Sequence, residues 1–174
     1  MTAWEARARV FGDDINTDYI VTSRRKRESL DPQVLRRYLF EEIDVGFAAT
    51  VEPGDVIVAG ANFGCGSAME VAVTAVVGAG IRAVLARSFS RTYYRNAVNN
   101  GLMPLECDTR GIAEGDRLLV EAASVRNLSN GRSTAIEPLP GVMREIIEAG
   151  GLVEYFRRNG RFRIGPQMNA DERR

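Results

Sequence analysis

The spacing of apolar residues changes along this chain, and the changes predict its elements. Residues 4–11 alternate apolar with polar side chains, as a half-buried strand does. Short apolar runs that are typical of buried strands follow at residues 56–59, 81–86 and 102–105. Residues 68–77 are apolar on nearly all sides and predict a buried helix. Residues 90–100 predict another helix, which ends at Asn99, Asn100 and Gly101. Strands and helices in this alternating order predict right-handed crossovers and a parallel sheet.

The segments before this unit predict a loop and a helix. Residues 12–29 carry too many charges for a core, so we expect a polar loop there. Asp31 and Pro32 form a helix start, with Asp31 as the cap and Pro32 in the first helical position. An apolar stripe extends this helix to about Phe40.

The segments after it predict an antiparallel part and a last helix. Residues 117–120 are expected to form a strand, and residues 125–128 and 133–136 a hairpin whose turn contains Asn130 and Gly131. A helix is expected from Val142 to about Arg158, with three residues on its inner side: Ile146, Ile147 and Val153.

These elements predict one α/β domain with a mixed, partly parallel sheet. We assign residues 1–160 to this domain and residues 161–174 to a polar C-terminal tail. A hydrophobic content of 45% is sufficient for a core in a chain of 174 residues.

Charge and composition exclude several classes of function. Basic and acidic residues number 23 each, so the overall field attracts neither nucleic acid nor an anionic membrane. The chain has no histidine, so proton transfer must use another side chain. Cys65 and Cys107 form no C-x-x-C pair and are too few to hold an iron–sulfur cluster alone. Without a signal peptide or a long apolar run, we expect a soluble cytoplasmic protein with reduced thiols.

A glycine-rich loop, residues 60–67 (GANFGCGS), is the main candidate for chemistry. It is not a P-loop, because Gly66 stands where that motif has lysine, and not a dinucleotide fingerprint, because Met69 stands at the third glycine. Ser67 is predicted at the N-terminal end of the following helix, where N–H groups favour an anion or a developing oxyanion. The alternative is a tight turn with Ser67 as an ordinary helix cap.

Three blocks of sequence resemble the small subunit of 3-isopropylmalate dehydratase, in the aconitase superfamily. They are residues 12–20 (GDDINTDYI), residues 60–67 and residues 88–102 (SFSRTYYRNAVNNGL). Their order and spacing fit over roughly residues 8–160. The resemblance implies a swivelling β/β/α domain of three layers.

The resemblance also implies which residues form the site. Ser67 would be the base that removes a proton from the carbon next to a carboxylate, and Asp18 would orient the serine or a substrate group. The loop residues expected to bind substrate are Asn62, Gly64, Gly66 and Ala68. The alternative for Asp18 is that it only holds a turn.

A run of four cations, residues 24–27, occupies the place of the family's substrate-recognition loop. Arg27 falls on the arginine of that loop and is expected to bind a carboxylate, with Arg24 as a second candidate. The alternative is a solvated basic patch. The family's arginine two residues after the serine is absent, because Met69 takes its place. A substrate related to 3-isopropylmalate, such as a dimethylmalate, is therefore a second candidate.

The resemblance implies a two-subunit hydro-lyase. A separate large subunit would carry a [4Fe–4S] cluster, this chain would bind none, and the chain would be inactive alone. The alternatives are the small subunit of homoaconitase or 2,3-dimethylmalate dehydratase and, in another class, a non-catalytic anion-binding regulatory module.

Overall fold

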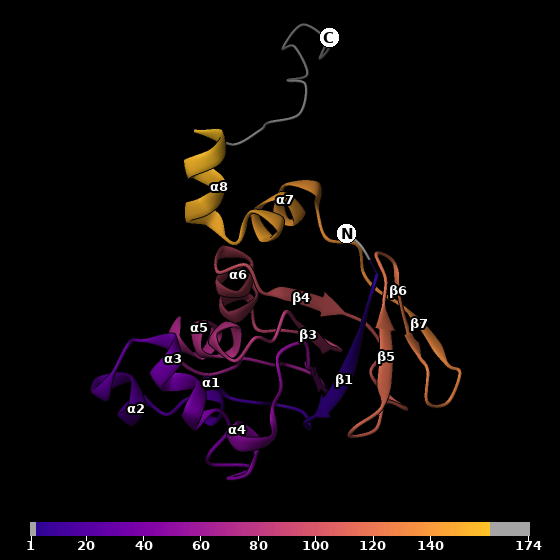
Figure 1. Cartoon of the computed structure of the whole chain (residues 1–174), viewed down its shortest axis with the longest axis horizontal. Coiled ribbons are helices and arrows are strands. Elements are labelled where there is room, and N and C mark those ends of the chain that lie inside the picture. Colours follow the sequence, from indigo (N-terminus) through magenta and orange to yellow (C-terminus); the bar gives the residue numbers. More distant parts are fainter. Residues whose placement is uncertain (1–2, 161–174) are drawn as a thin grey trace, which may run out of the picture.

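The computed structural model describes residues 3–160, and a mixed sheet runs through its centre (Figure 1). The order of the strands in this sheet is β4-β3-β2-β1-β5-β6-β7. The bounds are β1 Trp4–Val10, β2 Val56–Ala59, β3 Ala83–Ala86, β4 Met103–Glu106, β5 Arg117–Val120, β6 Ser124–Asn127 and β7 Ser133–Ala135. Strands β4, β3, β2 and β1 pair in parallel, whereas β1, β5, β6 and β7 pair in antiparallel fashion. Strand β1 therefore belongs to both halves of the sheet.

The predicted parallel unit is confirmed. Helix α5 (Val71–Gly78) connects β2 to β3, and helix α6 (Arg91–Asn99) connects β3 to β4. All four residues of β2 and all four of β3 are buried, which explains their unbroken apolar runs. The predicted antiparallel strands are also confirmed, with Val125 of β6 opposite Thr134 of β7.

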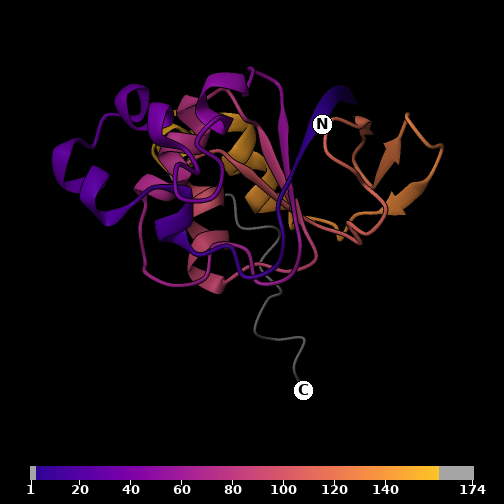
Figure 2. The ribbon, with the colours of Figure 1, turned by 90° about the horizontal axis from the view of Figure 1, so that it is seen from below.

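Two apolar cores separate three layers. Alternate residues of β2 point to opposite faces, so Ile57 packs among the helices while Val56 and Val58 pack against the antiparallel strands. Figure 2 shows the helices on one side of the parallel strands and β5 to β7 on the other. The sheet curls far enough for the Glu137 N–H, just after β7, to donate to the Glu106 carbonyl of β4 at 2.8 Å. The β/β/α arrangement is thus as expected.

The prediction of a polar loop over residues 12–29 is wrong. This segment contains helices α1 (Thr17–Ile20) and α2 (Ser23–Glu28). Asn16 and Thr22 cap them through side-chain oxygens. These caps stabilise helices whose sequences lack a clear apolar pattern. Ile20 is fully buried in the core on the helical side of the sheet. The sequence did not predict this burial, because the residues around Ile20 are largely charged or polar.

The two other predicted helices are shorter than expected. The helix that begins at Pro32 ends at Leu35 (α3, Pro32–Leu35) and continues as a 3₁₀ turn, Arg36–Tyr38. The C-terminal helix divides into α7 (Gly141–Ala149) and α8 (Leu152–Asn159). Gly150 and Gly151 break it with φ values of 93° and 116°, which favour glycine. Val153 therefore does not lie on an inner face but is 63% exposed.

The predicted tail, residues 161–174, lies outside the described residues. Within residues 3–160, no helix combines the length and apolar character that crossing a bilayer demands.

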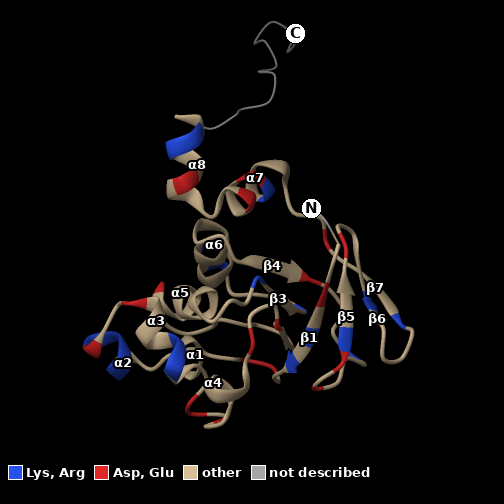
Figure 3. Cartoon of the chain, in the orientation of Figure 1, with Lys and Arg blue, Asp and Glu red and all other residues tan. Residues whose placement is uncertain are grey.

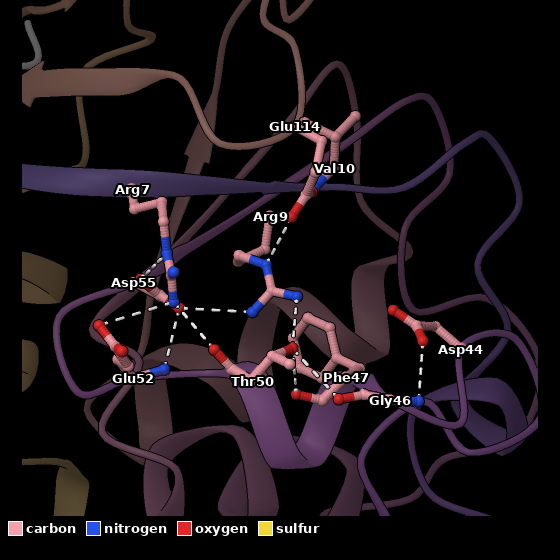
Figure 4. Close-up of polar contacts among 10 residues, drawn as sticks. All are labelled: Arg7, Arg9, Val10, Asp44, Gly46, Phe47, Thr50, Glu52, Asp55 and Glu114. Carbon is pink, nitrogen blue, oxygen red and sulfur yellow. Dashed lines mark hydrogen bonds and ion pairs between the residues drawn. The ribbon is translucent and has the colours of Figure 1, made fainter.

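A buried ion cluster fastens β1 to the turn before β2 (Figure 4). Asp55 is 4% exposed and accepts from Arg7 Nε and Nη2 at 3.0 and 2.8 Å. Its Oδ2 also lies 3.5 Å from Arg9 Nη1 and accepts from the Glu52 N–H at 2.9 Å. The Arg9 guanidinium stacks over the Phe47 ring of α4 (Phe47–Thr50), 4.6 Å from its centroid. The Asp55 carboxylate thus binds two arginines of β1, and Arg9 extends the cluster to α4.

Candidate active site

The three sequence blocks meet at one end of the parallel sheet. Each supplies the loop that follows a parallel strand: residues 11–16 after β1, residues 60–67 after β2 and residues 87–90 after β3. Such carboxyl ends of adjacent strands are the usual location of a ligand site in an α/β sheet. The Asp14 N–H donates to the Ala61 carbonyl at 2.9 Å, and the Phe63 N–H to the Ser88 carbonyl at 3.0 Å. The glycine loop therefore lies between the other two and is held by both.

Gly64 is a buried residue of the glycine loop. Its N–H donates to the Ile15 carbonyl at 2.8 Å, and its carbonyl accepts from Ser90 Oγ at 2.6 Å. Its φ is 74°, and a Cβ there would lie 2.2 Å from Cγ of Tyr93. Both polar groups of Gly64 are used inside the protein, so it shapes the loop.

Gly64→Ala is expected to destabilise the chain by about 3 kcal/mol, because left-handed backbone strain and overpacking against Tyr93 add together. Urea unfolding of the isolated chain would measure the loss. Gly115→Ala is the matched control, since Gly115 has a φ of 80° but nothing within 4 Å of its Cβ position. The control should lose only about 1 kcal/mol. Equal losses would mean that contact with Tyr93 does not restrict this position.

Ser67 lies at the exposed end of the loop, but not at a helix start as predicted. Helix α5 begins at Val71, and its N-cap position is Glu70, whose side chain makes no capping hydrogen bond. The apolar run misled the prediction, because Ala68 precedes the helix and is exposed, while Met69 is buried before the helix begins. The reading of Ser67 as an ordinary helix cap is therefore wrong too.

The backbone around Ser67 nevertheless offers hydrogen-bond donors. The N–H groups of Gly66, Ser67 and Ala68 donate to no acceptor within residues 3–160. All three residues are exposed. Three unpaired N–H groups in succession can bind an anion or stabilise an alkoxide without a helix dipole. Donors for an oxyanion would therefore come from the loop backbone and not from a helix start.

Asp18 lies in α1 and contacts the next helix. Its Oδ1 accepts from the Ser23 N–H at 2.8 Å and from Ser23 Oγ at 2.6 Å. No hydrogen bond joins Asp18 to Ser67 within the described part of the chain, and Oδ2 keeps its acceptor capacity there. Ser23 Oγ also contacts the sulfur of Met69 at 3.6 Å, and Met69 is 3% exposed.

Asn62 and Asp14 form a pair at the mouth of the loop. Both have left-handed backbones, with φ values of 60° and 55°, which is uncommon for residues other than glycine. Asn62 Nδ2 donates to Asp14 Oδ1 at 2.7 Å, so the pair joins two of the three blocks. Such strained residues cluster at functional sites.

The four cations lie on α2, visible as the blue segment at one edge of the molecule in Figure 3. Arg25 is fully engaged, because it binds Glu41 through two bonds of 2.9 Å and stacks on the Tyr38 ring. Arg24 makes one loose contact of 3.9 Å with Glu28. Arg27 is exposed and pairs with no acid among residues 3–160. Of the two predicted substrate residues, Arg27 is therefore the freer cation.

The surroundings of both cysteines disfavour the thiolate form. Burial raises the pKa of the Cys65 thiol, and the Asp14 charge raises it further. Burial, together with the Asp108 charge, raises the pKa of Cys107 to about 12. Within residues 3–160, no three acidic, cysteine or histidine side chains come together to hold a metal ion.

Sequence reasoning missed several residues that build the site. Arg87 bonds to Asp13, and this bond is the main cause of the lowered pKa of that carboxyl. Ser88 Oγ accepts from the Asn62 N–H at 2.8 Å, and Thr17 Oγ1 donates to the Ser67 carbonyl at 2.9 Å. All lie in or next to the three blocks, so proximity to the motifs was the available signal.

Comparisons with known proteins agree with this geometry. The family model of the aconitase C-terminal domain matches residues 39–110. The 3-isopropylmalate dehydratase small subunit 1 of Methanopyrus kandleri is 46% identical over 158 residues, which are 88% of this chain and 92% of the relative. The small subunit of Deinococcus deserti is 43% identical over 87% of this chain and 86% of its own length.

A solved structure extends the agreement to the whole fold. The crystal structure of 3-isopropylmalate dehydratase from Methanocaldococcus jannaschii matches with a TM-score of 0.88 at 40% identity. The match covers 91% of this chain and 96% of that one. The chain therefore belongs to the family of 3-isopropylmalate dehydratase small subunits, in the aconitase superfamily.

Proposed function

We propose that this chain is the small subunit of a two-subunit hydro-lyase that acts on 3-isopropylmalate, in leucine biosynthesis. The observation that carries the proposal is the position of Ser67, which is exposed where the three motif loops meet. Its own N–H group and those of Gly66 and Ala68 are unpaired within residues 3–160. The names of the relatives support the substrate. The cytoplasmic location that the sequence predicts belongs to the same proposal.

Ser67 would remove the proton from the carbon next to a substrate carboxylate as water leaves. A serine hydroxyl is a very weak acid, so its alkoxide needs strong stabilisation. The N–H groups of Gly66, Ser67 and Ala68 can supply that stabilisation in a site from which a partner excludes water. Asn62 and the free oxygen of Asp18 would orient substrate groups at the rim.

A large subunit would complete the site. The donor set of the described residues does not fit an iron–sulfur cluster, since the two thiols are separate and have raised pKa values. We assign the [4Fe–4S] cluster to that partner, where its iron would act as a Lewis acid on the leaving hydroxyl.

This division between subunits predicts that the isolated chain binds no iron and has no dehydratase activity. Anaerobic cluster reconstitution followed by iron analysis, with the chain alone and mixed with its large subunit, would measure both. Activity should arise only in the mixture. Stoichiometric iron on this chain alone would contradict the proposal.

Arg27 is proposed to bind a substrate carboxylate. Arg27→Ala should raise the KM of the assembled enzyme by about 30-fold or more, because the lost charge pair would be shielded from water in the complex. Lys26→Ala is the matched control, since Lys26 is an exposed neighbour on α2. The control should change KM less than about 2-fold. Equal effects of the two variants would mean that α2 is only a basic surface.

Met69 favours a second candidate substrate. In the family an arginine binds a substrate carboxylate at this place, whereas Met69 is buried and presents its thioether toward Ser23. This difference is consistent with a related alkylmalate as substrate, such as 2,3-dimethylmalate, whose carboxylates would be bound by other residues. Relative kcat/KM values of the assembled pair on a panel of malate derivatives would rank the two.

A further inference from the structure

The position of Ser67 depends on one buried hydroxyl group. Ser67 does not belong to a helix, and within residues 3–160 it receives a single hydrogen bond, from Thr17 Oγ1 to its carbonyl oxygen at 2.9 Å. We infer that Thr17 is a positioning residue that holds Ser67 in the geometry for proton removal. This inference rests on the function proposed above.

Thr17 holds the loop on both sides of Gly66. Its backbone N–H donates to the Cys65 carbonyl at 2.9 Å, while its hydroxyl reaches the carbonyl of Ser67. Between these two bonds, Gly66 has a φ of 87°, and a Cβ there would lie 2.5 Å from Asn16 Oδ1. The three residues 65–67 are therefore pressed against the start of α1, with both ends of the segment bonded to one residue.

The hydroxyl of Thr17 has no equivalent donor to replace it. Thr17 is 2% exposed, so water cannot easily take over the bond to the Ser67 carbonyl. The second oxygen near this hydroxyl, Asn16 Oδ1, lies farther away at 3.4 Å and already accepts from the Asp18 N–H at 2.9 Å. The single hydroxyl proton is thus directed to Ser67.

Loss of this bond would affect the reaction more than substrate affinity. Without the bond from Thr17, the exposed end of the loop would be free to rotate. Ser67 Oγ and the N–H groups of Gly66, Ser67 and Ala68 would then move relative to the substrate carbon. Misplacement by about 1 Å can cost roughly 100-fold in rate. Substrate affinity, in contrast, would come mainly from Arg27, which Thr17 does not contact.

The test uses the enzyme assembled with its large subunit and assayed with 3-isopropylmalate, or with the best substrate of the panel. Thr17→Val removes the donor but keeps the shape and is expected to lower kcat by about 10- to 100-fold. KM should stay within about 2-fold, and Thr17→Ser should keep kcat within about 3-fold of wild type. If Thr17→Val does not assemble, Thr17→Cys carries a weak donor in nearly the shape of serine and should be at least about 10-fold slower than Thr17→Ser.

Thr109→Val is the matched control for loss of a buried bond. Thr109 is 8% exposed, and its hydroxyl donates to the Ala59 carbonyl at 2.8 Å, at the end of β2. This control should lower stability while leaving kcat of the assembled enzyme near wild type. Equal kcat losses in Thr17→Val and Thr109→Val, or full kcat in Thr17→Val, would overturn the inference.

The Ser67→Ala variant separates this inference from the proposed function. An inactive Ser67→Ala enzyme together with a fully active Thr17→Val enzyme would refute the role of Thr17 alone. An active Ser67→Ala enzyme would refute the proposed role of Ser67, and with it the inference.

Discussion

Replacing Ser67 by alanine is expected to abolish turnover by the assembled enzyme. The hydroxyl would act only as the proton leaves the substrate, so its loss lowers kcat far more than it changes substrate binding. The fold should be unaffected, since the Ser67 side chain makes no hydrogen bond within residues 3–160 and the residue is exposed. Initial rates of the pair, with circular dichroism of the chain, would measure both effects.

Ser133→Ala is a suitable control, because Ser133 is an exposed serine on β7, in the antiparallel half of the sheet. It should retain wild-type kinetics. Retention by Ser67→Ala of more than about a tenth of the wild-type rate, which corresponds to less than roughly 1.4 kcal/mol of activation free energy, would assign the base to another residue.

Asp55→Asn is expected to cause a large loss of stability. The amide has the shape of the carboxylate, but it has no charge and turns an N–H₂ group toward the guanidinium donors of Arg7 and Arg9. Leaving a buried charge without its partner costs about 3 kcal/mol or more. Urea unfolding of the isolated chain would show the midpoint moving to lower concentration with an unchanged slope.

A surface pair of similar geometry provides the control. Asp108 accepts from Arg110 through two bonds of 2.8 Å, but both side chains are largely exposed. Asp108→Asn should therefore change stability far less than Asp55→Asn. Equal losses would contradict the view that burial makes the Asp55 cluster important.

The effect of Asp55→Asn should also depend on pH. Burial alone would raise the pKa of Asp55, but the bonds from Arg7 and from the Glu52 N–H and the charges of Arg7 and Arg9 hold it below the ordinary value of 3.8. A carboxyl with a lowered pKa contributes stability that is fully present above its unfolded pKa and is lost as pH falls through the folded one. The difference between wild type and variant should thus be constant near neutrality and shrink below pH 3.8.

The parallel core was predictable because its strands are buried on both faces. Such strands have unbroken apolar runs, and the positions of β2, β3 and β4 follow from them within one or two residues. Helices α1 and α2 were not predictable from apolar spacing, because both are too short to show a period. Asn16 and Thr22 cap them, and only α1 has buried residues. The curl of the sheet depends on contacts between residues such as Cys107 and Ile136, which are distant in sequence.

The sequence motifs of the candidate site could be predicted, but the positions of their residues relative to one another could not. The blocks identified Ser67 and Asp18, and the run of cations at residues 24–27 identified Arg27. The fold brings the loops of Ser67 and Asp18 together. Their roles stay predictions. The sequence alone misplaced Ser67 at a helix start, because the apolar side chains of Ala68 and Met69 resemble the helix that follows them. The hydrogen bond from Thr17 to Ser67 joins residues 50 positions apart, and no local pattern encodes it.

We propose above that this chain supplies the base of a 3-isopropylmalate dehydratase and that a partner supplies the metal chemistry. The most direct measurement is the steady-state rate of 3-isopropylmalate dehydration by the chain alone, by the reconstituted large subunit alone and by the two mixed, with wild-type and Ser67→Ala chains in parallel. We predict turnover only in the mixture that contains the wild-type chain, and an assembled but silent complex with Ser67→Ala. Wild-type turnover in the Ser67→Ala mixture would refute the role of Ser67 as the base, and turnover by either subunit alone would refute the division of the reaction between two subunits.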